Sequence, residues 1–112
     1  MYADFYTQKT DGYGVQGDVP IVKRDKLPEG AKKINGNILR LGEVTGHHHI
    51  VDGPCQLYEV DQPNKSAELW VEFFGDVAVK HHEHGTLLFP AGVYVVPDQV
   101  EYDGEEERRV LD

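Results

Sequence analysis

The residues best suited to chemistry are the histidines, because all six fall in two short clusters at residues 47–49 and 81–84. Imidazole is the commonest protein ligand for transition metals. Alternate side chains of a β-strand share a side, so His47 pairs with His49 on one face, and His82 pairs with His84. Two facing strands could present up to four imidazoles to one ion, and two or three would suffice. The sequence therefore predicts a mononuclear metal site.

The remaining residues of the clusters leave several arrangements open. Strand alternation turns His48 away from the site and puts His81 on the same side as Glu83, unless a bulge near Gly85 changes the register. Three histidines with an open position suit copper or zinc, whereas two histidines with Glu83 would form the facial triad of iron oxygenases. Gln56 is a candidate fourth ligand or an orienting residue, or it is an ordinary exposed strand glutamine. The alternative to a metal site is a solvated or pH-sensitive polar patch.

The composition of the chain argues against nucleic-acid and membrane partners. The chain has 112 residues, of which 11 are lysine or arginine and 20 are acidic, with a formal net charge of -9. This charge repels phosphate, so we expect no nucleic-acid partner. No apolar run approaches the ~20 residues that span a bilayer, so we expect no membrane partner. The one cysteine, Cys55, excludes an intrachain disulfide.

The elements that must position the histidines are short strands. A strand is predicted at residues 38–41, before the first histidine cluster, and another at residues 55–60, after an Asp52-Gly53-Pro54 turn. Residues 61–66 then form a hairpin loop. Residues 67–74 alternate, with Leu69, Val71 and Phe73 on one face and Trp70 on the other. Residues 77–82 follow, with Val77, Val79 and His81 on a shared face. The strands 86–89 and 93–96 flank a Pro90-Ala91-Gly92 turn, and residues 99–102 form a last short strand.

These strands predict an all-β fold, an antiparallel barrel or sandwich. A single domain is expected over residues 1–112, because the chain is too short for two cores. Within it, residues 1–36 form an irregular or edge-strand segment, residues 37–102 the barrel and residues 103–112 a tail. The aromatic residues Tyr2, Phe5 and Tyr6 could cover sheet edges of a partner, so we expect a homodimer.

Particular motifs also resemble known families. The HxH of His47 and His49 and the PxG turn at residues 90–92 resemble the cupins, small jelly-roll barrels that hold one transition metal. Here Gln56 lies later, and the second cluster earlier, than the corresponding cupin ligands. The strings TGHHH, HHEH, PAGVY and QVEY, within residues 37–112, resemble small cupin-like proteins of bacteria and phages with the pattern TGHxH, HxEH, PxGxY and QxEY. In size and ligand type the chain is also similar to small copper-dependent cupins that oxidise cellulose.

Together, these observations predict a metal-dependent oxidoreductase with an ion held by His47, His49 and His84, assisted by His82 or Gln56. Copper is expected first and iron second, with zinc possible, and the substrate is a small molecule or a polysaccharide such as cellulose. The competing class is a non-enzymatic metal-binding or structural β module of a bacterial or phage assembly. The N-terminal residues lack the features of an export signal, so the default expectation is a cytoplasmic protein, or an extracellular one if a signal has been removed.

Overall fold

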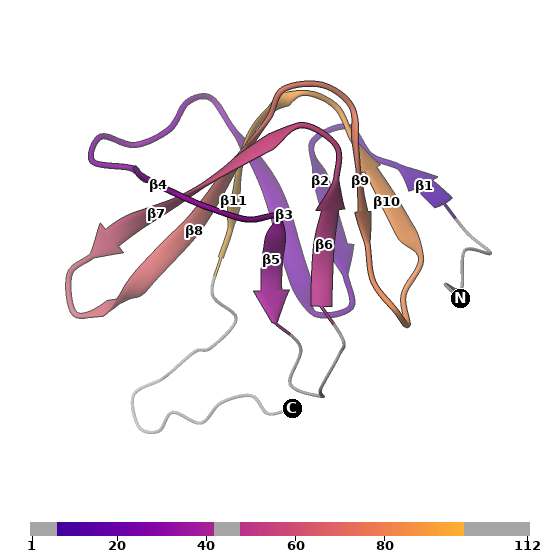
Figure 1. The fold of residues 1–112 in the computed structure, drawn as a ribbon, viewed down its shortest axis with the longest axis horizontal. Helices are drawn as coiled ribbons and strands as arrows, with labels where there is room; N and C mark the ends of the chain where they lie inside the picture. Colours follow the sequence, from indigo (N-terminus) through magenta and orange to yellow (C-terminus); the bar gives the residue numbers. More distant parts are fainter. Residues whose placement is uncertain (1–6, 42–47, 98–112) are drawn as a thin grey trace.

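The computed structural model describes residues 7–41 and 48–97, which form eleven strands and no helix (Figure 1). The strands are β1 (Thr7–Lys9), β2 (Tyr13–Gln16), β3 (Val19–Arg24), β4 (Lys32–Ile34), β5 (Ile38–Leu41), β6 (His48–Asp52), β7 (Cys55–Gln62), β8 (Lys65–Phe73), β9 (Val77–Lys80), β10 (Thr86–Phe89) and β11 (Gly92–Val96). The all-β prediction is confirmed. In the described ranges, no helix is long and apolar enough to cross a membrane.

The strands form two sheets packed as a small sandwich. The five-stranded sheet has the order β1-β10-β9-β6-β5, and the six-stranded sheet has the order β2-β3-β11-β8-β7-β4. Antiparallel pairs join the strands, as predicted, except that β1 pairs with β10 in parallel. The chain alternates between the sheets in pairs: β5 and β6 lie in the first, β7 and β8 in the second, and β9 and β10 in the first again.

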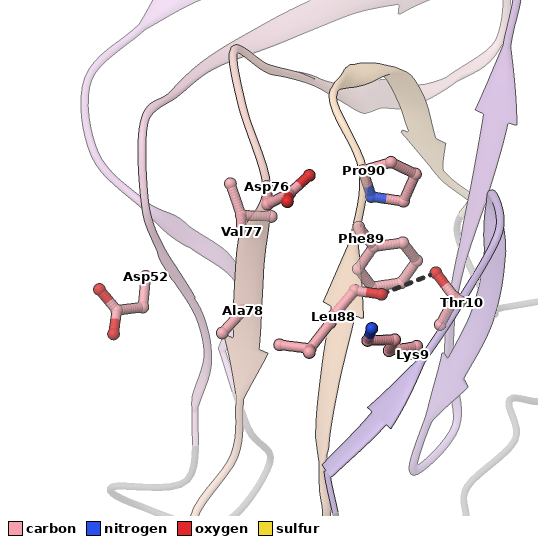
Figure 2. A pocket seen from close by; sticks show the side chains of 9 residues that line it. All are labelled: Lys9, Thr10, Asp52, Asp76, Val77, Ala78, Leu88, Phe89 and Pro90. Atoms are coloured by element: carbon pink, nitrogen blue, oxygen red, sulfur yellow. Dashed lines mark hydrogen bonds between the residues drawn. The ribbon is translucent and has the colours of Figure 1, made fainter.

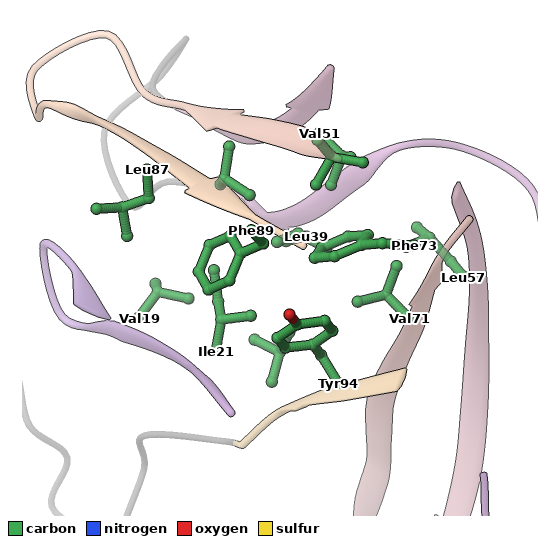
Figure 3. Packing of buried hydrophobic residues seen from close by; sticks show 13 residues of the cluster. Val19, Ile21, Leu39, Val51, Leu57, Val71, Phe73, Leu87, Phe89 and Tyr94 are labelled. Carbon is green, nitrogen blue, oxygen red and sulfur yellow. The ribbon is translucent and has the colours of Figure 1, made fainter. Parts of the chain in front are cut away.

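The main core lies between the two inner faces. In β8, Val71 and Phe73 are buried in this core, whereas Trp70 packs with Tyr58 and Val95 in a second cluster on the other side of the sheet. The predicted alternation of β8 therefore matches the structure. At the centre of Figure 3, Phe73, Phe89 and Tyr94 form an aromatic group, with ring centroids 4.8 to 5.8 Å apart. Aromatic pairs at this spacing add to the stabilisation that burial provides.

The N-terminal part of the chain is more regular than the sequence analysis expects. Residues 7–34 contain four strands, and β3 lies inside the six-stranded sheet, between β2 and β11. Val19 and Ile21 of β3 are almost fully buried. Pro20 lies between them and weakens the sequence pattern, because proline lacks a backbone donor. It pairs with Val15 of β2, and the pairing of β3 with β11 involves Val22 to Arg24, so proline does not interrupt that ladder.

The turns before and after β7 connect the strands in different ways. The Asp52-Gly53-Pro54 turn carries the chain from one sheet to the other, since β6 and β7 do not pair. Gly53 has a φ of 140°, and a Cβ there would lie 2.8 Å from Val77 Cγ1, so this turn requires glycine. The loop after β7 is tighter than predicted, because β8 begins at Lys65. The predicted strand 99–102, the tail 103–112 and the aromatic residues 2–6 lie outside the described residues.

Candidate functional site

Three histidine rings meet at one end of the sandwich: His49 of β6, His81 just after β9 and His84 just before β10. The ring centroid of His81 lies 4.3 Å from that of His49 and 4.6 Å from that of His84, and the His49 and His84 centroids are 6.5 Å apart. His49 and His81 are buried, with 5% and 6% of their surface exposed, whereas His84 is exposed. We refer to these three residues as the histidine cluster. In Figure 1 the start of β6, the β9–β10 connection and the β2–β3 turn all lie at the lower end of the strands.

Gln16 at the end of β2 fixes the orientation of His49. The Gln16 Nε2 group donates to the backbone oxygens of Val79 and Gly85, each at 2.8 Å. These two bonds use both amide hydrogens and leave Oε1, 3.0 Å from His49 Nδ1, as the acceptor. His49 therefore carries a proton on Nδ1, and in its neutral form Nε2 has the lone pair. An orienting hydrogen bond on one ring nitrogen is typical of histidines that bind metals through the other.

His81 has the opposite arrangement. The backbone N–H of Glu83 donates to His81 Nδ1 at 2.9 Å, so Nδ1 is an acceptor and the neutral ring carries its proton on Nε2. The Nε2 group of His81 is then a hydrogen-bond donor, not a ligand. His81 thus supplies a proton donor beside the two neighbouring rings.

His84 packs against the β2–β3 turn. Gly17 has a φ of 63°, and a Cβ at this position would lie 2.7 Å from His84 Nε2. The turn needs glycine for its left-handed backbone, and it also needs glycine to admit the imidazole. Gln16 and Gly17 are consecutive residues, so a single turn positions two of the three rings.

The cluster fits a metal site in part. Within residues 7–41 and 48–97, no group of three or more His, Cys, Asp or Glu side chains is arranged to hold an ion. The tautomer of His49 and the exposure of His84 suit two imidazole ligands. His47, the third ligand predicted from the sequence, lies outside the described residues. The two positioned rings therefore provide an incomplete set, to which a residue of the first histidine run would have to contribute.

Three further residues are His82 and Gln56, which were predicted to assist the site, and His48, which was predicted to point away from it. His82 is exposed in the connection after β9. Gln56 donates its amide hydrogens to the backbone oxygens of Ile34 and Leu57, on β4 and β7, so it ties two strands together. His48 is half-buried on the opposite face of β6 from His49, and its Nδ1 is buried without a hydrogen-bond partner among the described residues.

Cys55 is not suited to the role of a thiolate ligand. Its side chain is half-buried at the margin of the main core, and burial raises the pKa of the thiol. A raised pKa keeps the sulfur protonated, whereas metal binding requires the thiolate. Cys55 is therefore a small packing residue.

Sequence reasoning missed Gln16 and underrated His81. The residues of β2 alternate between exposed and buried, with Gly14 and Gln16 facing inward, and this alternation could have drawn attention to a glutamine on an otherwise apolar face. The sequence analysis places His81 on one face with Val77 and Val79, and all three side chains are buried. What the pattern did not reveal is that this face ends beside His49.

A pocket of about 330 Å³ adjoins His84. It is lined by Gln8 of β1, by residues 15–17 and by residues 84–87. His84 therefore belongs both to the cluster and to the wall of this pocket.

A larger pocket of about 440 Å³ lies on the outer face of the five-stranded sheet. Figure 2 shows Ala78 and Leu88 at its base, with Asp52 on one side and Lys9 and Thr10 on the other. Asp52 forms an ion pair of 3.0 Å with Lys80. No histidine of residues 48–97 lines this pocket, so it is separate from the histidine cluster.

Residues 15–99 match a protein family described as a domain of unknown function, DUF8820. Since the match covers most of the chain, the protein belongs to this family. Neither the curated proteins nor the solved structures contain a significant match to the chain.

Proposed function

We propose that the protein binds one transition-metal ion per chain at the histidine cluster, through His49, His84 and His47. The observation that carries this proposal is the hydrogen bond from His49 Nδ1 to Gln16 Oε1 at 3.0 Å, which presents Nε2 as the ligating nitrogen. A buried glutamine whose amide hydrogens are held by two backbone oxygens, so that its own oxygen accepts from one imidazole, is the kind of support that ligand histidines receive.

Copper is the first choice of metal and iron the second, with zinc possible, because the proposed ligands are neutral imidazoles. Copper held by imidazoles can supply one-electron redox chemistry with dioxygen or peroxide. The chain's own contribution is to orient His49 through Gln16, to keep a proton on His81 Nε2, and to expose His84 toward a pocket. These features favour an oxidoreductase acting on a small molecule or on the end of a polysaccharide such as cellulose.

The second candidate is a non-enzymatic metal-binding module of a bacterial or phage assembly. It is favoured by apolar side chains exposed on the edge strand β2, where Tyr13 and Val15 have 61% and 45% of their surface accessible. Exposed apolar residues beside an unpaired strand edge are suited to contact with another chain.

Oxygen and peroxide consumption separate the two candidates. In the presence of reductant, the copper-loaded protein should consume either oxidant faster than an equal concentration of free copper. The variant His49→Ala should remove the excess, and products should then be sought from cellulose, chitin and soluble oligosaccharides. Turnover equal to that of free copper, with no product from any sugar, would leave the metal-binding module as the function.

A further inference from the structure

We infer that the pocket beside His84 binds a neutral, hydroxyl-bearing small molecule, and that His84 hydrogen bonds to one of its hydroxyl groups. This inference deepens the proposed function. Any oxidation of the bound molecule rests on that function, whereas the binding itself does not. Its starting point is that the pocket of about 330 Å³ shares His84 with the histidine cluster. A volume at the small end of the range for ligand sites limits the occupant to a small molecule or one end of a chain.

The residues that line the pocket favour a ligand without net charge. No aspartate, glutamate, lysine or arginine is among the described residues that line the pocket. A charged ligand would lose part of its hydration there and would meet no carboxylate, ammonium or guanidinium group among these residues. The net charge of -9 adds long-range repulsion against anions.

The polar groups at the pocket suit hydroxyls. Gln8 is exposed on β1 and brings an amide with both donor and acceptor atoms. Gln16 is not available for this purpose, because its amide hydrogens are donated to Val79 and Gly85 and its oxygen faces His49. The imidazole of His84, which packs against Gly17, is therefore the group that a bound hydroxyl would contact. A hydroxyl bonded to His84 would lie next to the histidine cluster.

The apolar residues that line the pocket favour a ligand that also has an apolar face. The exposed Val15 and the buried Leu87 both line the pocket, so a ligand meets apolar surface as well as polar groups. Rings that carry hydroxyls at the edge and C–H groups on the face, such as pyranoses, match this mixture. A strongly apolar ligand would leave the polar groups unsatisfied.

The test is a titration of the metal-free, isotope-labelled protein followed by backbone amide NMR. The neutral probes are glucose and cellobiose, and the matched charged probes are glucuronate and glucosamine, each at about 10 mM, where a site with a Kd of about 1 mM is mostly filled. We expect shifts at Gly17, Gly85 and Thr86 with the neutral probes, and affinity at least about tenfold weaker for the charged ones.

Two neighbouring residues of β1 give a matched pair of variants. Gln8 lines this pocket, whereas Lys9 lines the larger pocket on the outer face. Gln8→Trp should fill the pocket and abolish the shifts, and Lys9→Trp should preserve them. Val15→Trp provides a second obstruction if Gln8→Trp does not fold.

No shift with either neutral probe, equal binding of glucuronate or glucosamine, or unchanged binding in both obstructing variants would overturn the inference. Because the titration uses protein without metal, its result is independent of metal binding. Sugar binding without metal binding would refute the proposed function alone, and metal binding without sugar binding would refute this inference alone.

Discussion

Replacing Gln16 tests the arrangement that the proposed site depends on. Gln16→Leu keeps the size of the side chain but removes its three hydrogen bonds, to His49 Nδ1 and to the backbone oxygens of Val79 and Gly85. Leaving a buried polar group without its partner costs about 1–3 kcal/mol. The Gly85 bond is only partly buried, so water can replace it, and the loss comes mainly from the other two. We expect the free energy of unfolding to fall by about 3 kcal/mol.

A loss of this size is measurable and specific. In a domain of this length it corresponds to a melting temperature lower by roughly 12 °C. The control is Gln62→Leu, whose side-chain bond to the Ser66 oxygen is exposed and which should change stability by less than about 1 kcal/mol. Circular dichroism melts of the three proteins measure the difference.

Gln16→Glu separates stability from ligand orientation. Its carboxylate can still accept the His49 Nδ1 proton, but it cannot donate to the two carbonyls, so we expect lower stability with the same His49 tautomer. Copper affinity should therefore fall by about 10–100-fold in Gln16→Leu and not in Gln16→Glu. Imidazole nitrogen NMR shifts report the tautomer. If Gln16→Leu melted like the wild type with an unchanged His49 tautomer, our account of the site would be wrong.

Three other predictions concern separate features of the molecule. Gly17→Ala should weaken copper binding, because its Cβ would displace the His84 ring. The control Gly30→Ala, at a similar φ of 83° with nothing within 4 Å, should lose only about 1–2 kcal/mol of stability and keep the copper affinity of the wild type. Equal copper affinities of the two variants in titration calorimetry would contradict this prediction. Burial raises the pKa of Tyr94 to about 12, so the stability that this group contributes is complete below its unfolded pKa near 10 and is lost as the pH rises to about 12. Tyr94→Phe, which loses the 2.9 Å bond to the Pro90 oxygen, should be less stable at neutral pH and show a smaller alkaline loss in pH-dependent denaturant melts; an unchanged alkaline loss would refute the assignment. Finally, the protein should be a homodimer through its sheet edges, and a monomer mass in light scattering at micromolar concentration would exclude this.

The strands whose side chains alternate over several residues could be predicted from the sequence. Leu69, Val71 and Phe73 in β8 form one apolar face, and this pattern depends only on the period of a strand. The N-terminal strands were harder to predict, since β1 and part of β3 pair with β10 and β11, which lie more than 60 residues later, and Pro20 weakens the strand pattern where β3 pairs with β2. Such pairing depends on the packed structure and leaves a weak local pattern.

The candidate site was predictable only in outline. Strand alternation pairs His82 with His84, but β9 ends at Lys80, and beyond that residue the period of two no longer applies. The chain bends through residues 81–85, and this bend brings His81 and His84 to the same end as His49. Gln16 was invisible to spacing arguments because it comes from β2, which lies 33 residues before the histidine it holds.

Titration calorimetry of the chelator-treated protein, purified without an affinity column, tests the central claim most directly. We predict one copper ion per chain at neutral pH, with affinity that falls below about pH 6 as the imidazoles protonate. His47→Ala, His49→Ala and His84→Ala should each weaken binding strongly, and His48→Ala should bind copper as the wild type does, because it lies on the opposite face of β6. The absence of binding for copper, iron and zinc, or a loss in His48→Ala as large as in His49→Ala, would contradict the proposed site.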